Sequence, residues 1–274
     1  MRHSNIVVFC AVDPFLGPRG QTLFGFDKLL EGLANSGVPC VWLTNRTRGQ
    51  LDEIRRRVEA TDPFIAEEGC GVYIPEDYFH LKGAKTIRLG RFLCIPVAQP
   101  QPASKDALEA LSLESGVMTV PLRSLTPREL AQNTGLAPRE ADLVRTRDFD
   151  EVFFFAGTGD AEIQRFISLG SERELAIRPH GNLWSLAAGA NTQQCIRQLA
   201  GFYDRALHKK AYRLGIAASK DASSFSPVCD RMIQIASGAS RAREEDVQGD
   251  KAGRLVLSEP DVWDRVLSAV KSGR

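Results

Sequence analysis

Apolar runs alternate with amphipathic stretches along the first third of the chain. The continuous apolar run from Ile6 to Val12 is typical of a buried parallel strand. Apolar residues then recur at helical spacing from Thr22 to Ser36, and a second apolar run extends from Val38 to Leu43. An Arg-rich helix from Gln50 to Glu59 is expected next. This order predicts a right-handed β-α-β unit that begins a doubly wound, mostly parallel sheet.

The middle of the chain has a different pattern. A Phe-rich strand from Glu151 to Phe155, a helix from Asp160 to Leu169 and a strand from Leu175 to Arg178 indicate an inserted α+β domain. From about Thr192 the chain returns to helix, strand and helix. We therefore predict an α/β protein with a core domain of residues 1–85 and 190–274, interrupted by an α+β cap domain of residues 86–189.

Composition excludes several classes of function. Among 274 residues, 35 Lys and Arg stand against 34 Asp and Glu, so a net charge of +1 favours neither nucleic acid nor an anionic membrane as a partner. No apolar segment approaches the roughly 18 residues of a spanning helix, and the first residues lead into a strand rather than a signal peptide. These features predict a cytoplasmic protein. The six cysteines lie far apart, which argues against a zinc site or a disulfide framework.

Candidate chemistry lies where the first two strands end. Ligand crevices of doubly wound sheets form at the carboxyl ends of the strands, and both Asp13 and Thr44 fall there. An Asp-x-Asp pair at such a point could supply a nucleophile, a general acid/base and two metal ligands. Ala11, two residues before Asp13, supplies none of these. The sequence therefore suggests a fold that has lost part of its chemistry.

Several longer segments resemble a known family. They run from Thr61 to Gly69, from Val72 to Phe79, from Thr126 to Leu130 and from Arg147 to Phe153. In this order they resemble the haloacid-dehalogenase-like (HAD) phosphatases of the Cof-type subfamily IIB, and among them the mannosyl-3-phosphoglycerate phosphatases. The resemblance extends over nearly the whole chain. It implies a doubly wound core with a large inserted cap and, in active members, phosphoryl transfer to an aspartate beside Mg²⁺.

The resemblance also assigns the motif positions of this chain. Asp13 falls at the acid/base, and Asp221 takes the place of an Asn in the acidic loop, so these two are the candidate metal ligands. The positions of the nucleophile, the lysine and two metal-binding acids hold Ala11, Thr192, Ala218 and Ala222. Because Mg²⁺ normally needs several oxygen ligands, no cofactor is expected. Mg²⁺ would be required only if the chain were an active phosphatase.

The candidate ligand-binding residues follow from the same resemblance. Thr44, Asn45 and Arg46 correspond to the corner that holds the phosphoryl group, while Arg147 and Asn182 are the candidates from the cap. Two structural alternatives stay open. Thr44 could cap the next helix, and Arg147 could form an ion pair with its acidic neighbours.

Three functions remain compatible with these residues. The leading hypothesis is an inactive or strongly impaired phosphatase homologue, a pseudophosphatase that binds a small anionic or sugar-like ligand or a protein partner. Loss of the nucleophile alone typically lowers turnover on the order of 10⁶-fold. The second is an active Mg²⁺-dependent phosphatase of mannosyl-3-phosphoglycerate or a related sugar phosphate, with a rearranged site. The third is a scaffold for a pathway enzyme, which a crevice filled by Phe15 would favour.

Overall fold

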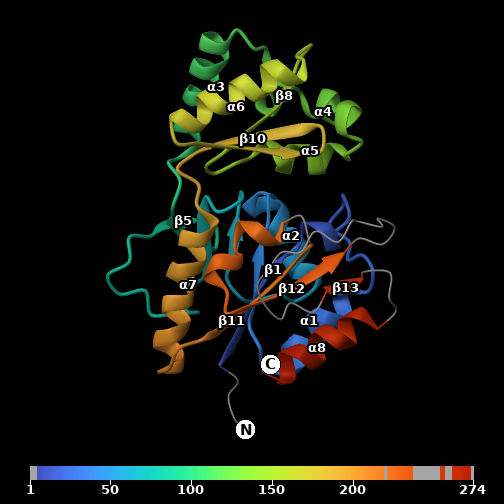
Figure 1. Ribbon diagram of the computed structural model, residues 1–274, viewed down its shortest axis with the longest axis vertical. Coiled ribbons are helices and arrows are strands. Elements are labelled where there is room, and N and C mark those ends of the chain that lie inside the picture. The colour runs from blue at the N-terminus through green and yellow to red at the C-terminus, as the bar shows by residue number, and fades with distance from the viewer. Residues whose placement is uncertain (1–4, 219–220, 237–253, 257–260, 273–274) are drawn as a thin grey trace.

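The computed structural model describes residues 5–218, 221–236, 254–256 and 261–272. Figure 1 shows a large sheet flanked by helices, with a smaller sheet and its own helices at one end. The expected α/β fold with a doubly wound, mostly parallel sheet is confirmed. Within these residues, no helix combines the length and the apolar character needed to cross a bilayer.

The large sheet has nine described strands in the order β13-β12-β11-β1-β2-β3-β4-β6-β5. From β13 to β3 neighbouring strands are parallel, whereas β4, β6 and β5 form an antiparallel edge. The strands are β1 (Ile6–Ala11), β2 (Cys40–Leu43), β3 (Phe64–Ala66), β4 (Gly71–Pro75), β5 (Ile87–Leu89), β6 (Phe92–Pro96), β11 (Tyr212–Ala218), β12 (Arg231–Ala236) and β13 (Arg254–Val256).

Helices cover both faces of this sheet. One face packs against α1 (Phe26–Asn35), α2 (Arg48–Arg57) and α8 (Val262–Ser272), and the other against α7 (Thr192–Leu207). Alternate side chains of β1 enter the two cores, with Cys10 on the α1 side and Phe9 on the α7 side. The first helix begins at Phe26 rather than Thr22, because Phe24 and Gly25 adopt left-handed backbone angles that no helix can include.

The small sheet is antiparallel, in the order β7-β8-β10-β9. Its strands are β7 (Thr119–Pro121), β8 (Glu151–Phe155), β9 (Leu175–His180) and β10 (Leu183–Ala188). The helices around it are α3 (Gln101–Ser115), α4 (Pro127–Thr134), α5 (Pro138–Arg145) and α6 (Asp160–Glu172). Apolar side chains of α3 and α6 pack on Phe153 and Leu186 of this sheet.

Two strands that follow residue 86, the predicted start of the cap, belong to the large sheet. β5 and β6 pair with the large sheet through β4, so the chain joins the smaller part only after Pro96. The hydrogen bond from the Gln99 amide to the Ala188 carbonyl (2.9 Å) lies where the chain enters and leaves that part. The apolar segment Phe92–Pro96, which forms β6, therefore packs in the core of the large sheet, where Cys94 is fully buried.

Candidate functional site

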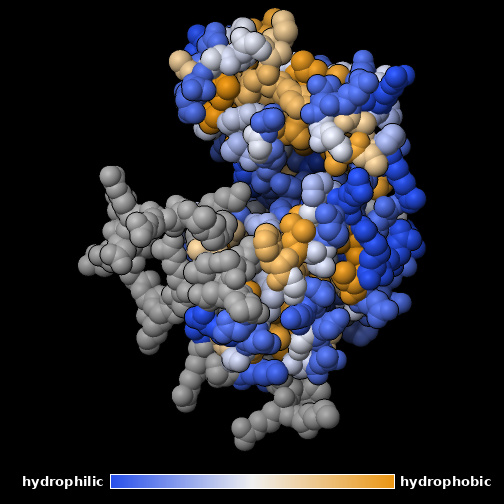
Figure 2. Space-filling view, turned by 90° about the vertical axis from the view of Figure 1, so that its right-hand side faces the viewer, coloured by the Kyte–Doolittle hydropathy of each residue, from blue (hydrophilic) through white to orange (hydrophobic). Residues whose placement is uncertain are grey.

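A cavity of about 980 Å³ lies between the carboxyl ends of the large sheet and the β9–β10 turn of the small one. Figure 2 shows a hollow between the two parts with a largely hydrophilic surface. The crevice is open and is not filled by Phe15, which packs against Phe26 and Trp263 in the core (ring centroids 5.2 Å apart in each pair). Its described lining includes Ala11, Asp13, Thr44, Glu68, Arg178 and Asp221.

Asp13 forms one corner of this cavity together with the loop that follows β2. The Thr44 hydroxyl donates to Asp13 Oδ1 (2.6 Å), and the Asn45 backbone N–H donates to Oδ2 (2.8 Å). The Arg46 guanidinium lies 3.4 Å from Oδ1 and also donates to the Gly17 carbonyl (3.0 Å). Thr44, Asn45 and Arg46, predicted from the sequence to bind a ligand, here contact a side chain of the protein itself.

Thr44 does not cap the following helix. The cap of α2 is Thr47, whose hydroxyl accepts the Gln50 backbone N–H (3.2 Å), while the Gln50 side chain accepts the Thr47 N–H (3.0 Å). Because Thr47 satisfies the first turn of α2, the Thr44 hydroxyl remains available to bind Asp13. The Thr44 oxygen also accepts the Arg46 N–H (3.1 Å).

Two of the four substituted motif positions line the same cavity, and the other two are buried. Ala11 at the end of β1 and Thr192 at the start of α7 both line it, but the Thr192 hydroxyl donates to the Glu68 carbonyl (2.9 Å). Ala218 at the end of β11 and Ala222 are buried, and Asp221 lies in the lining. Among the described residues, no group of three or more His, Cys, Asp and Glu side chains could hold a metal ion. Asp13 and Asp221 thus lack a third such ligand in this part of the chain.

Glu68 is a cavity residue that sequence reasoning missed. Its carboxylate lies 3.3 Å from Arg178 Nη1, and the same guanidinium nitrogen donates to the Glu68 carbonyl (2.7 Å). Burial raises the pKa of Glu68 to about 7, although Arg178 opposes the shift. Its position in the sequence could have identified it, because Glu68 follows β3 and therefore lies at the same carboxyl edge of the sheet as Asp13.

His180 joins the two parts of the molecule above this corner. Its Nδ1 lies 3.1 Å from the Asn45 side-chain nitrogen, and its Nε2 lies 3.0 Å from Ser185 Oγ and 3.5 Å from Glu68 Oε1. Burial, with help from the nearby Arg147 guanidinium, lowers the pKa of His180 to about 4. The imidazole is therefore neutral at neutral pH. With Asn45 donating to Nδ1, the ring carries its hydrogen on Nε2 and donates it towards Ser185 or Glu68.

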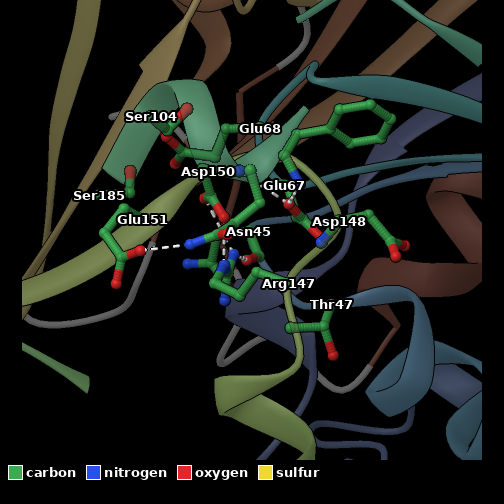
Figure 3. Close-up of polar contacts among 12 residues, drawn as sticks. Asn45, Thr47, Glu67, Glu68, Ser104, Arg147, Asp148, Asp150, Glu151 and Ser185 are labelled. Atoms are coloured by element: carbon green, nitrogen blue, oxygen red, sulfur yellow. Dashed lines mark hydrogen bonds and ion pairs between the residues drawn. The ribbon is translucent and has the colours of Figure 1, made fainter. Parts of the chain in front are cut away.

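Arg147 lies in a buried network beside the cavity, shown in Figure 3, instead of in its lining. Its guanidinium pairs with Asp150 and donates to the Asn45 carbonyl (2.7 Å). Glu67 accepts the backbone N–H groups of residues 148, 149 and 150 at 2.8–3.0 Å. Burial and the neighbouring Asp150 carboxyl raise the pKa of Glu67, and Arg147 opposes them. These contacts give Arg147 the structural ion pair that the sequence left open as an alternative to ligand contact.

Asn182, the other candidate from the cap, is exposed in the β9–β10 turn and is not among the described residues that line the cavity. The neighbouring Gly181 does line it. Apart from Asn182, the predicted site residues therefore fall into two groups. Asp13, Thr44, Asn45 and Asp221 lie in the cavity wall, whereas Arg46 and Arg147 lie behind it and hold other protein groups.

Comparisons with known proteins agree with this architecture. No family model matches the chain. It is 24% identical over 174 residues to the glucosyl-3-phosphoglycerate/mannosyl-3-phosphoglycerate phosphatase of Methanococcoides burtonii, a match that covers 64% of each chain. It is 25% identical over 148 residues to the mannosyl-3-phosphoglycerate phosphatase of Pyrococcus horikoshii, over 54% of this chain and 59% of that protein. The matches thus span less than two thirds of either relative.

Solved structures cover almost the whole chain. A phosphatase of the HAD superfamily from Bacteroides thetaiotaomicron superposes with a TM-score of 0.63 at 16% identity, covering 99% of this chain and 97% of that one. A subclass IIB sugar phosphatase of the same superfamily gives a TM-score of 0.56 at 17% identity and covers 98% of each chain. The sequence and structural matches together confirm the resemblance to Cof-type HAD proteins and to mannosyl-3-phosphoglycerate phosphatases.

Proposed function

We propose that this HAD-fold chain is a phosphatase homologue that no longer transfers phosphoryl groups and instead binds a small polar, sugar-like ligand in its cavity. The observation that carries the proposal is the corner around Asp13. The acid/base position survives there, but its carboxylate accepts hydrogen bonds from Thr44 and Asn45, and Ala11 offers no nucleophilic atom beside it.

The charges of the cavity support the same conclusion. Phosphoryl transfer needs cations that offset the charge of the nucleophile and of the transferred group. Among the described residues that line the cavity, Arg178 supplies a guanidinium group, and this group already forms an ion pair with Glu68. Thr192 provides a hydroxyl at the lysine position and directs it to a backbone carbonyl. Neither group is placed to neutralise a phosphate beside Ala11.

The open cavity favours a ligand over a purely scaffolding role. A hollow of about 980 Å³ is large enough for a sugar-sized molecule, and its lining mixes carboxylates, amides and hydroxyls with Pro14, Leu43 and Ile65. Such a mixture is suited to polar ligands that carry several hydrogen-bonding groups. The cytoplasmic location expected from the sequence is part of this proposal and would place the site among soluble metabolites.

The second candidate is an active phosphatase with a rearranged site, and the names of the relatives favour it. It would use Asp13 and Asp221, both in the cavity wall, to hold Mg²⁺. The two functions differ in whether phosphate is released. They can therefore be separated by one assay.

The test measures phosphate release from mannosyl-3-phosphoglycerate and from p-nitrophenyl phosphate with the purified chain and Mg²⁺. We expect no release above the protein-free rate. Ala11→Asp should not restore it, because the lysine and two acidic positions are still lost. Mg²⁺-dependent release that Asp13→Asn abolishes would overturn the proposal and establish the second candidate. Asp148→Asn is the matched control, since it removes a carboxylate that lies outside the cavity lining.

A further inference from the structure

We propose that the Asp13 carboxylate is a built-in anion that occupies the phosphate corner and excludes phosphate, so that the cavity selects uncharged, hydroxyl-rich ligands. This inference rests on the proposed function and specifies the ligand class of the same site. It assigns Asp13 a role in specificity instead of a remnant role in proton transfer.

Two hydrogen-bond donors of the corner already bind Asp13, and Arg46 forms an ion pair with it. The Thr44 hydroxyl and the Asn45 backbone N–H each donate to a different oxygen of Asp13, at 2.6 and 2.8 Å. The Arg46 guanidinium contacts Asp13 on one side, at 3.4 Å, and the Leu16 and Gly17 carbonyls on the other. A hydroxyl, a loop amide and a guanidinium that converge on two oxygens form an anion-binding arrangement. A phosphate could reach these donors only by displacing Asp13.

The rest of the cavity reinforces this exclusion. Glu68 and Asp221 add two carboxyl groups to the described lining, and the guanidinium of Arg178 lies against Glu68. A phosphate dianion in the corner would therefore meet the Asp13 carboxylate at short range, in a cavity whose wall carries two further carboxyl groups. Hydroxyl groups meet no such barrier, because they can donate to carboxylate oxygens and accept from amide nitrogens. The polar groups of the cavity wall are therefore suited to a ligand that presents hydroxyl groups, and no phosphate, to the corner around Asp13.

The experiment titrates inorganic phosphate into the full chain by isothermal calorimetry, in wild type, Asp13→Ala and Asp13→Ala/Thr44→Val. We expect wild type to show no saturable binding at millimolar phosphate. Asp13→Ala should bind at least about tenfold more tightly, since removal of one like charge and release of the donors typically changes affinity by that order. The added Thr44→Val should remove most of this gain.

Asp221→Ala is the matched control. It removes one carboxyl from the same lining without touching the donors of the corner, so a general change of charge would raise phosphate binding in both variants. Asp13→Asn, which keeps the shape of the side chain, serves if Asp13→Ala melts much below wild type. Phosphate binding by wild type as tight as by the Asp13 variants overturns the inference. An equal gain in Asp221→Ala also overturns it.

The two proposals fail in different ways. The phosphate titration needs no turnover, so a wild-type protein that binds phosphate but releases none from an ester refutes only the exclusion by Asp13. A protein that hydrolyses the ester in the Mg²⁺ assay refutes the proposed function instead. In that case Asp13 would be a proton-transfer group that must let the phosphate approach.

Discussion

Glu67 and Glu68 are adjacent in the turn after β3, yet they lie in two regions with different organisation. Both have left-handed backbone angles, with φ of 48° and 54°, and Gly69 follows at 91°. Glu67 is 1% exposed, and backbone N–H groups of the segment before β8 surround its carboxylate. Glu68 points into the cavity, with 24% of its side chain exposed and Arg178 as its ionic partner.

The difference shows what the protein needs from each carboxyl group. Three backbone donors and Arg147 compensate Glu67 inside the protein, so its role is to attach the small sheet to the large one. Glu68 contacts two side chains of β9, Arg178 and His180, and faces the space that a ligand would enter. Glu67 holds the segment before β8 against the turn after β3, and Glu68 contributes a carboxyl group to the cavity wall. Substitutions of Glu67 should therefore affect the attachment of the small sheet to the large one, and substitutions of Glu68 should affect the ligands that the cavity accepts.

The largest expected effect belongs to Glu67→Ala. It leaves three backbone N–H groups without their acceptor and removes a carboxyl group whose pKa the Arg147 guanidinium helps to lower. Breaking a buried, hydrogen-bonded charge network typically costs about 3–5 kcal/mol, and we expect that loss in the free energy of unfolding. Urea denaturation followed by circular dichroism would measure it.

Glu67→Gln is the matched control, because it keeps one acceptor oxygen and the shape of the side chain. Its cost should be smaller, about 1–3 kcal/mol, which is typical of a buried hydrogen-bonding group left partly unsatisfied. Equal losses of unfolding free energy in the two variants would mean that Glu67 does not stabilise the fold by accepting these hydrogen bonds. The attachment would then rest on other contacts, such as the Arg48–Asp148 pair (2.9 Å).

This contrast also shows how far the sequence could predict the molecule. Strand and helix periodicity, with the family resemblance, was sufficient for the fold and for the meeting of Asp13 and Thr44, since both follow parallel strands. It could not distinguish Glu67 from Glu68, because their opposite directions depend on consecutive left-handed residues. Arg147 was ambiguous for a related reason. Its partner Asp150 is close in sequence, but the Asn45 carbonyl is brought near only by the tertiary fold.

A medium effect is expected from the titration of Glu68. Its pKa in the folded protein is about 7, raised from about 4.5 mainly by burial. A raised pKa means that the neutral form is favoured in the fold, so this contribution to stability is complete below pH 4.5 and is lost as the pH rises through 7. Relative to Glu68→Gln, wild type should lose up to about 3 kcal/mol between pH 4 and pH 8, by the usual conversion of pKa shifts into free energy.

The comparison of these two proteins isolates Glu68 from His180. The lowered pKa of His180, about 4, gives a contribution of opposite sign, present above pH 6.5 and lost as the pH falls through 4. Because His180 is present in both proteins, most of its contribution cancels in the difference. Urea midpoints measured at intervals from pH 4 to pH 8 would show the trend. A difference that grows in favour of wild type at high pH would mean that Arg178 outweighs burial at this site.

The smallest effect should come from a link between the two parts that lies at the surface. Arg139 of α5 pairs with Glu53 of α2, but 81% of the Arg139 side chain is exposed. Solvent screens such pairs, and they typically contribute about 0–1 kcal/mol. Arg139→Ala should therefore leave the unfolding free energy nearly unchanged, measured under the same urea conditions as Glu67→Ala. If Arg139→Ala instead cost as much as Glu67→Ala, surface charge would contribute as much as the buried Glu67 carboxyl group to the attachment of the small sheet.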